Sequence, residues 1–410
     1  MAEAALDAID TGAAMRRAVS LEGATLCVAG EAVPLAPSGR LRLVAVGKCA
    51  TAAAAALCDL LGPKLFYGIV LDVAEAARLP LGDVQVLHGT HPMPSAANVE
   101  ATRSILRFLE GGRPEDVVLC VVSGGGSTLL CLPPGGSTFE DERAALEALF
   151  RAGASIQEIN TVRKHSSLAR GGQLARAARP ARVIGLIFSD VPGGTLDLVA
   201  SGPTVRDPST VTDAERVLER YGLPAAGSAR FPLIETPKDP ADFSRVHNAV
   251  VVSNEVALSA MAASAKREGF AAEVRTATLS GEAREVARQV ARDLHAAPSG
   301  TALLYGGETT VTVRGAGRGG RNLELALAAL DALGDDELVL TLATDGRDNG
   351  DLAGAIADAV TRRDAQRAGA DPATFLAAND SYGFFARVPH ALETGPTGAN
   401  VADLIVALRR

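Results

Sequence analysis

The sequence contains few aromatic residues: no Trp, four Tyr and eleven Phe among 410 residues. Proteins that bind single-stranded nucleic acid stack bases on aromatic side chains and offer a basic surface to the phosphates. Because aromatics are scarce and the net charge is -8, no nucleic acid partner is expected. No apolar run approaches the roughly 20 residues of a membrane span, so no membrane partner is expected either. A small anion is still compatible, since a few local positive groups can bind it.

Cysteine is also sparse, and the five cysteines show no Cys-x-x-Cys pair and no Cys/His metal spacing. This pattern argues against a disulfide framework and favours a reducing, cytoplasmic location. The N-terminus carries early acidic residues and lacks a continuous apolar stretch. It therefore predicts an amphipathic helix, not a signal peptide.

Short apolar runs that end in Gly, Ser or Asp recur along the chain, each followed by a helical pattern. Continuous apolar strands that alternate with helices predict a parallel sheet covered on both faces. Ligands of such sheets bind at the carboxyl ends of the strands, and the polar motifs described below lie there. Segment 204–246, rich in proline and charge, breaks this rhythm and places a domain boundary near residue 245. The runs lie at 41–48, 116–126, 181–190, 248–254, 301–308 and 337–346.

Two motifs in the first half have the character of anion sites. Only five of the forty basic residues are Lys, so Lys48 stands out after Gly47, where it would place an ammonium beside helix-terminal N–H groups. Ser-Gly-Gly-Gly-Ser-Thr at 123–128 predicts a nest of backbone N–H groups, with hydroxyl donors added by its serine and threonine. The first motif is not a Walker P-loop, because Arg42 stands where glycine is required and Cys49 replaces Ser or Thr.

Charged residues follow two further elements of the first half. Glu158, Asn160, Arg163, Lys164 and His165 form a cluster that predicts either an anion site or a charged helix surface. Asp190, at the end of a strand, is placed to accept a hydroxyl proton, to hold Mg²⁺ or to cap a turn. His91 lies in a proline-rich loop, for which a structural role is expected.

The second half combines glycine with arginine and aspartate. Arg318 and Arg321 lie in GAGRGGRN (315–322) at the start of a helical pattern, a position that suits a multiply charged phosphate. The same glycines satisfy Gly-x-Gly-x-x-Gly, the dinucleotide fingerprint, so binding of NAD(P)H stays open. Asp345 and Asp348 follow a strand and predict either an Mg²⁺ site or an Asx turn.

Together these motifs resemble those of the glycerate 2-kinases of the MOFRL family, whose members are often named hydroxypyruvate reductases. The resemblance extends from about residue 40 to the end of the chain. The motifs that carry it are AVGK (45–48), GTHPMPS (89–95), VVSGGGST (121–128), EINTVRKH (158–165), GGQLA (171–175), FSDVPGG (188–194), ASGPTVRDPST (200–210), YGGETTVTVRGAGRGGRNLELA (305–326), TDGRD (344–348), NDSY (379–382) and TGPTGANVADL (394–404).

The resemblance implies a fold and an activity. The fold would be a Rossmann-like three-layer N-terminal domain over 1–245 and a smaller α/β MOFRL-type domain over 246–410, with the active site in the cleft between them. The activity would be ATP-dependent, Mg²⁺-assisted phosphorylation of D-glycerate to 2-phospho-D-glycerate. Two alternatives are kept: an NAD(P)H-dependent hydroxypyruvate reductase and a non-catalytic sensor of glycerate or nucleotide. Assembly as a homodimer is also kept open.

These considerations give a set of site residues. The expected catalytic residues are Lys48, Asp190 and Arg321, and the expected metal ligands are Asp190 and Asp345. The expected substrate-binding residues are Asn160, Arg163 and Lys164. The expected ATP-binding residues are Ser123, Gly124, Gly125, Gly126, Ser127, Thr128, Gly307, Glu308, Arg318 and Asn322.

Overall fold

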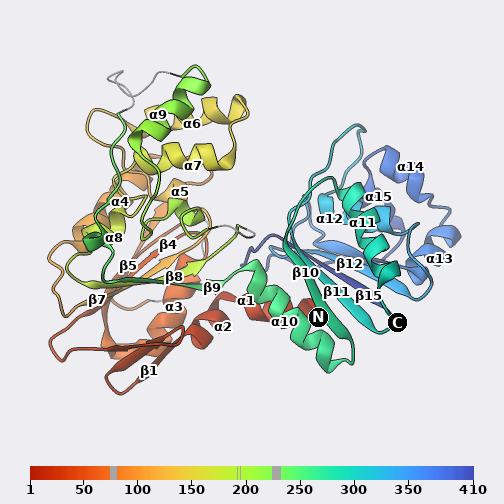
Figure 1. The fold of residues 1–410 in the computed structure, drawn as a ribbon, viewed down its shortest axis with the longest axis horizontal. Coiled ribbons are helices and arrows are strands. Elements are labelled where there is room, and N and C mark those ends of the chain that lie inside the picture. The colour runs from red at the N-terminus through yellow and green to blue at the C-terminus, as the bar shows by residue number, and fades with distance from the viewer. Residues whose placement is uncertain (74–80, 192, 194, 224–231) are drawn as a thin grey trace. The chain divides into compact units, whose positions relative to one another are not determined.

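The computed structural model describes residues 1–73, 81–191, 193, 195–223 and 232–410, which form two compact units (Figure 1). Unit 1 comprises Met1–Asp10, Asp190–Gly193 and Val252–Arg410. Unit 2 comprises Thr11–Ser189 and Gly194–Val251. Among the described residues, no helix combines the length and the apolar character that crossing a membrane needs.

Unit 2 is built on a six-stranded sheet with the order β6-β5-β4-β7-β8-β9. The neighbouring pairs from β6 to β8 all run parallel, which confirms the parallel sheet expected from the apolar runs. In chain order this is 3-2-1-4-5-6, the order of the Rossmann fold. The last strand begins just after the boundary expected at residue 245, yet it is an edge strand of this sheet. The strands are β4 (Leu41–Val46), β5 (Leu65–Val73), β6 (Val84–Gly89), β7 (Val117–Val122), β8 (Arg182–Phe188) and β9 (Val246–Val252).

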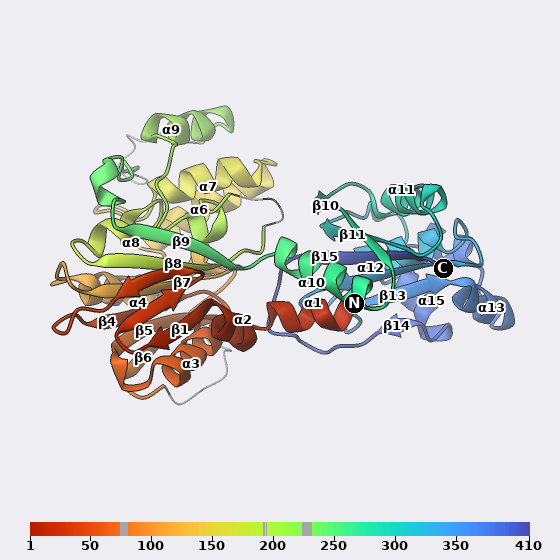
Figure 2. The ribbon, with the colours of Figure 1, turned by 60° about the horizontal axis from the view of Figure 1, so that its bottom comes forward.

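Helices cover both faces of this sheet (Figure 2). Apolar side chains of α4 and α8 pack with β4, β5 and β7 on one face, and α3 contacts β4 and β5 from the other. A separate apolar cluster joins α6, α7 and α9, and β1–β3 form a small antiparallel sheet. The bounds are β1 (Val19–Glu22), β2 (Thr25–Val28), β3 (Glu31–Pro34), α3 (Ala50–Leu61), α4 (Ala96–Leu109), α5 (Gly126–Leu129), α6 (Phe139–Arg151), α7 (Ile156–His165), α8 (Gln173–Ala177) and α9 (Val211–Arg220).

The N-terminal segment forms two helices where one was expected. The chain breaks at Asp10, whose backbone has an extended ψ of 129°. Helix α1 (Ala2–Ile9) packs on α10 (Asn254–Arg267) within unit 1, whereas α2 (Thr11–Ala18) packs on α3 within unit 2.

The sheet of unit 1 is mixed, with the order β10-β11-β15-β12-β13-β14. The expectation of parallel strands in this half was wrong, because the C-terminal strand β15 inserts antiparallel between β11 and β12. These two strands therefore run in the same direction, and their last residues, Gly307 and Ala343, both lie opposite Asp403. The strands are β10 (Ala271–Leu279), β11 (Thr301–Gly307), β12 (Glu337–Ala343), β13 (Gly354–Asp358), β14 (Ala391–Leu392) and β15 (Asp403–Arg409).

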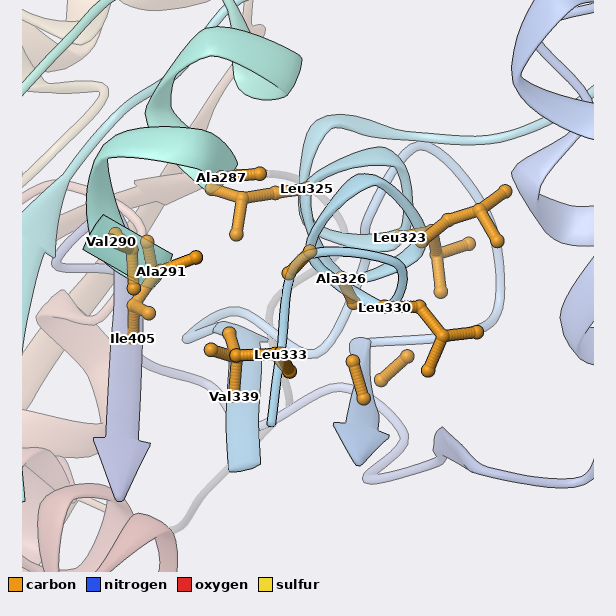
Figure 3. Close-up of a cluster of buried hydrophobic side chains, with 14 of the residues drawn as sticks. Ala287, Val290, Ala291, Leu323, Leu325, Ala326, Leu330, Leu333, Val339 and Ile405 are labelled. Carbon is orange, nitrogen blue, oxygen red and sulfur yellow. The ribbon is translucent and has the colours of Figure 1, made fainter. Parts of the chain in front are cut away.

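The core of unit 1 lies between helices α11 and α12 and the sheet (Figure 3). Val290 of α11, Leu323 of α12 and Val339 of β12 have no exposed surface. Burial of such side chains is the main favourable term for folding of the unit. The helices are α11 (Ala283–Ala296), α12 (Arg321–Ala329), α13 (Ala359–Arg367), α14 (Pro372–Ala377) and α15 (Ser381–Arg387).

The core predicts a difference between two helical valines. We expect Val290→Ala to lower the free energy of unfolding by about 2–3 kcal/mol, because it removes two buried methyl groups and leaves a cavity. Val360, on α13, is 42% exposed, so Val360→Ala should change the free energy of unfolding by less than about 0.5 kcal/mol. Urea unfolding followed by circular dichroism measures both. Equal losses would contradict the burial that distinguishes the two sites.

Candidate active site

The first candidate site lies where the strand order of unit 2 reverses. Strands β4 and β7 are adjacent and parallel, and Val46 lies opposite Val122 at their ends. The connections that follow them lead to opposite faces of the sheet, and this divergence opens the crevice in which doubly wound sheets bind ligands. Lys48 follows β4 and the Ser123–Thr128 loop follows β7, so both predicted anion motifs are at this point.

Hydrogen bonds and a close contact hold the Lys48 loop and the Ser123–Thr128 loop together. The N–H of Lys48 donates to the carbonyl of Gly124 at 3.0 Å, and the N–H of Ser123 donates to the carbonyl of Val46 at 2.9 Å. Gly47 has a φ of +123°, and a Cβ there would lie 2.0 Å from the Oγ of Ser123. Only glycine fits this approach. These contacts hold Lys48 over the second loop, where its side chain lies above Gly125.

Backbone donors to an anion are available in the second loop. At the start of α3, the N–H of Cys49 donates to Ser123 and that of Thr51 donates to Asp72. By contrast, the N–H groups of Gly124, Gly125 and Ser127 donate to no described residue. The ammonium of Lys48 is exposed and likewise has no partner among the described residues. This arrangement is a half-open nest beside an uncompensated positive charge.

The three hydroxyl groups of this loop differ in accessibility. The Oγ of Ser123 is buried and donates to the carbonyl of Val46, and the Oγ1 of Thr128 donates to the carbonyl of Pro92 at 3.2 Å. Both hydroxyl groups thus donate to carbonyl groups of the protein. From the sequence, these residues were expected to bind ATP. The Oγ of Ser127 lies 2.9 Å from the Oγ of Ser201 and is half-buried.

A histidine and an arginine lie near this loop. The ring of His91 would contact a Cβ at Gly125, and burial together with the charges of Lys48 and Arg163 lowers the pKa of His91. A structural role was expected for this histidine, and its ring lies beside the glycine loop. Burial lowers the pKa of Arg163 to about 10, so its guanidinium stays charged. Arg163 forms no ion pair with a described residue.

The loop that carries His91 is held by Asn98 of α4, which the sequence did not single out. Its Oδ1 accepts from the N–H of Thr90 at 2.9 Å, and its Nδ2 donates to the carbonyls of Thr90 and Thr128 at 3.0 Å. This buried amide joins the loops of His91 and Ser127.

The three residues expected to bind substrate, which all lie on α7, have different environments. Arg163 is half-buried and Asn160 is buried beside Ser201. Lys164 is buried between Asp197, at 2.5 Å, and Asp207, at 3.2 Å. Its charge is already balanced by two carboxylates, so the structure gives it no free ammonium for a ligand.

The second candidate site lies in unit 1, at the ends of β11 and β12. Arg321 donates through Nε and Nη2 to Asp403, with the Nη2 contact at 3.1 Å, and its Nη1 lies 3.0 Å from Glu308. Hydrogen bonding to Asp403 raises the pKa of Arg321 despite burial. Because Asp403 begins the inserted strand β15, the sheet itself fixes this arginine. Glu308 is 56% exposed, so the Nη1 edge is the accessible part of the guanidinium.

Two residues expected to contact ATP have internal roles instead. Asn322 is buried, and its Nδ2 donates to Asp348, whose carboxylate also caps α12 through the N–H groups of Asn322 and Leu323. Burial raises the pKa of Asp348. A Cβ on Gly307 would lie 2.1 Å from the carbonyl oxygen of Leu279, so the neighbouring strand accounts for this glycine.

The dinucleotide fingerprint has a different explanation in the structure. A Cβ on Gly315 would lie 2.1 Å from the carbonyl oxygen of Ala378, and a Cβ on Gly320 would lie 2.3 Å from that of Asp348. Residues 308–320, moreover, separate β11 from α12, so the glycines do not form the tight strand-to-helix turn that a pyrophosphate needs. They allow close packing of protein backbone, which weakens the reductase alternative.

An open pocket of about 620 Å³ lies beside these loops in unit 1. Arg318 stacks on Tyr382, with 4.1 Å from its guanidinium carbon to the ring centre, and Arg347 forms no ion pair with a described residue. Both arginines border a volume of the size that small ligands occupy. The lining residues are Arg318, Gly346, Arg347, Asn349, Gly350, Asp351, Gly395 and Pro396.

The expected metal ligands do not form a closed metal cage. Asp345 accepts from the N–H of Arg347 through Oδ1, in an Asx turn, and its Oδ2 has no partner among the described residues. No group of three or more His, Cys, Asp or Glu side chains in the described part of the chain is placed to hold a metal. Asp190 is half-buried, follows β8 and belongs to unit 1, while Pro192 and Gly194 of its motif lie outside the described residues. One free carboxylate oxygen fits an Mg²⁺ that arrives on nucleotide phosphates.

Comparison with known proteins agrees with the α/β fold of the two units. Residues 1–231 match the domain of unknown function DUF4147, and residues 301–403 match the MOFRL family. D-glycerate 2-kinase of Thermotoga maritima is 40% identical over 389 residues, which cover 92% of this chain and 93% of that protein. A putative hydroxypyruvate reductase of Agrobacterium vitis is also 40% identical, over 91% of this chain and 88% of its own length.

A solved structure shows the same fold throughout. The crystal structure of glycerate kinase from Thermotoga maritima has a TM-score of 0.91 and 37% identity, and the match covers 100% of this chain and 97% of that one. The chain therefore belongs to the MOFRL-containing family of glycerate kinases.

The Asp403–Arg321 pair generates a pH prediction. Burial raises the pKa of Asp403 to about 6 although Arg321 opposes the shift, against about 3.9 in an unfolded chain. Between these values the folded state binds more protons, so this group's contribution to stability is lost as pH rises from about 4 to about 6. We expect the wild type to lose stability relative to Asp403→Asn over that interval, measured by urea unfolding. A gain in the stability of the wild type relative to Asp403→Asn would show that the ion pair with Arg321 affects the pKa of Asp403 more than burial does.

Proposed function

We propose that the protein transfers the γ-phosphoryl group of ATP to the 2-hydroxyl of D-glycerate and so forms 2-phospho-D-glycerate. The observation that carries this proposal is the Lys48 ammonium beside the N–H groups of Gly124, Gly125 and Ser127 at the switch point of a Rossmann-type sheet, all without a partner among the described residues. Phosphoryl transfer depends on positioned positive charge and backbone donors more than on covalent chemistry by the protein. The relatives named glycerate kinase support the choice of substrate.

Lys48 and Arg321 would act on the phosphoryl group in transfer. Lys48 offers a flexible point charge, and the loop beneath it offers backbone donors to phosphate oxygens. Arg321 is held rigidly by Asp403, so only its Nη1 edge would meet the phosphoryl group, in exchange for Glu308. Such preorganised donors stabilise charge that develops in the transition state.

The acid would be held by residues of α7. Arg163 has no carboxylate partner among the described residues, and its planar guanidinium suits the carboxylate of glycerate. Asn160 would contact a substrate oxygen through its Nδ2, which donates to no described residue. Lys164, paired with two aspartates, would fix α7 instead of contacting the substrate. Asp190 would orient the 2-hydroxyl and accept its proton.

The nucleotide would extend over the loops of unit 1. Arg318 and Arg347 would meet its phosphates in the pocket that they border. Asp345 would hold Mg²⁺ through its free Oδ2 together with phosphate oxygens, and the ion would neutralise charge on those oxygens.

Lys48→Ala tests the proposal. We expect kcat/KM for D-glycerate to fall at least about 100-fold, the loss typical of removing one preorganised donor, as measured by ADP release with Mg·ATP. Lys266→Ala, at an exposed position on α10, should retain full activity. The same wild-type preparation should not oxidise NADH with hydroxypyruvate. Full turnover in Lys48→Ala, or NADH oxidation without ADP release, would overturn the assignment.

Arg347→Ala tests the position of the nucleotide. Loss of one charged contact to phosphate should raise the KM for ATP about 10-fold or more and leave the KM for D-glycerate unchanged. Arg363→Ala removes an equally exposed arginine on α13 and should change neither constant. An unchanged KM for ATP in Arg347→Ala would place the nucleotide elsewhere without contradicting kinase activity.

A further inference from the structure

A short chain of hydrogen bonds runs from the candidate site into unit 2. Ser201 donates through Oγ to the Oδ1 of Asn160 at 2.8 Å, and its Oγ lies 2.9 Å from the Oγ of Ser127. Ser201 has no exposed surface and Asn160 is 4% exposed, whereas Ser127 is half-buried. The chain therefore ends in one accessible hydroxyl, that of Ser127.

The direction of each hydrogen bond follows from counting protons. An amide oxygen only accepts, so the single hydroxyl proton of Ser201 is used on Asn160. The contact between the two serines then needs the proton of Ser127, which points at Ser201. As a result, the Oγ of Ser127 turns only its lone pairs towards the site.

The backbone around Ser201 is held in an unusual conformation. Ala200 and Ser201 have φ values of +51° and +59°, which residues other than glycine rarely adopt. The carbonyl of Ser201 accepts from the N–H of Gly171 at 2.9 Å, and a Cβ on Gly126 would lie 2.5 Å from that of Ala200. Backbone strain of this kind persists where surrounding structure imposes it, and it is concentrated at functional sites. The strained segment keeps the Oγ of Ser201 against the Ser127 loop.

We propose that Ser201, whose proton is taken up by the Oδ1 of Asn160, is a positioning residue that holds Ser127 as a hydrogen-bond acceptor, so that Ser127 receives a hydroxyl group of the acid substrate. The unprotonated oxygens of phosphate and carboxylate groups only accept, and an acceptor repels them. A hydroxyl group can donate, and D-glycerate has two. This inference rests on the proposed function, and it replaces the phosphate-donor role expected for Ser127 with a role in recognising a hydroxy acid.

Ser201→Ala gives the sharpest test because it predicts effects of opposite sign. Without an acceptor at position 201, the proton of Ser127 becomes available to a ligand. Isothermal calorimetry should show D-glycerate binding about 5–10-fold more weakly, the loss of one hydrogen bond. Sulfate, which carries no proton at neutral pH and so can only accept, should bind at least about 3-fold more tightly, since it gains a donor. Equal weakening of both ligands would mean that Ser201 only supports the fold, which would overturn the proposal.

Two companion variants keep the test decisive. Ser201→Gly also removes the hydroxyl but suits a φ of +59°, so it should reproduce both shifts even if Ser201→Ala folds poorly. In Ser127→Ala, adding Ser201→Ala should cause no further change in either affinity, because the effect passes through Ser127. A persisting effect in that background would contradict the proposed path. Ser167→Ala, at a buried serine that donates to the carbonyl of Leu130, should leave the ratio of the two affinities unchanged.

The outcome is separable from that of the proposed function. If the wild type binds no D-glycerate, the substrate assignment fails. The sulfate measurement still reports the direction of the Ser127 proton, and an unchanged sulfate affinity in Ser201→Ala would overturn the acceptor role.

Discussion

The contact between Gly47 and Ser123 is the constraint on which the candidate site of unit 2 depends. It joins the ends of β4 and β7, where the strand order reverses, and it leaves no room for a side chain at position 47. Ser123 also accepts from the N–H of Cys49 at the start of α3, whereas the N–H groups of Gly124 and Gly125 donate to no described residue. The close approach thus holds Lys48 beside the backbone donors of the glycine loop. The His91 loop and α7 then add their groups around a geometry that is already set.

In unit 1, a different sheet topology positions the candidate site residue. Insertion of β15 between β11 and β12 brings a carboxylate, Asp403, to the point where two strands end. That carboxylate fixes Arg321 in a bidentate pair, and Asn254 supports the backbone beside it by donating to the carbonyl of Val401 at 2.8 Å. The arginine is therefore held by a carboxylate, whereas the ammonium of Lys48 has no partner among the described residues. Arginine presents a planar fork of donors and lysine a compact point charge.

Much of this organisation follows from sequence patterns, and the exceptions have physical causes. The apolar runs predicted the parallel sheet of unit 2 because alternation with helices is a local signal, and they placed Lys48 and the glycine loop at strand ends. Pairing of β15 depends on contacts across about a hundred residues, so the antiparallel insertion and Asp403 were missed. The available sequence signal for this strand was a single aspartate, Asp403, directly before the apolar run LIVAL (404–408). The contacts of Lys164 were not predicted because its partners, Asp197 and Asp207, lie 33 and 43 residues away in the sequence.

The central claim, transfer of phosphate to the 2-hydroxyl of D-glycerate, is tested most directly by the ³¹P spectrum of the product. In 2-phospho-D-glycerate the phosphate oxygen is attached to a carbon with one hydrogen, and in 3-phospho-D-glycerate to a carbon with two. After incubation of the protein with D-glycerate and Mg·ATP, the account predicts a new proton-coupled doublet together with the signals of ADP. A triplet would show the other regiochemistry, and an unchanged ATP spectrum would contradict kinase activity altogether.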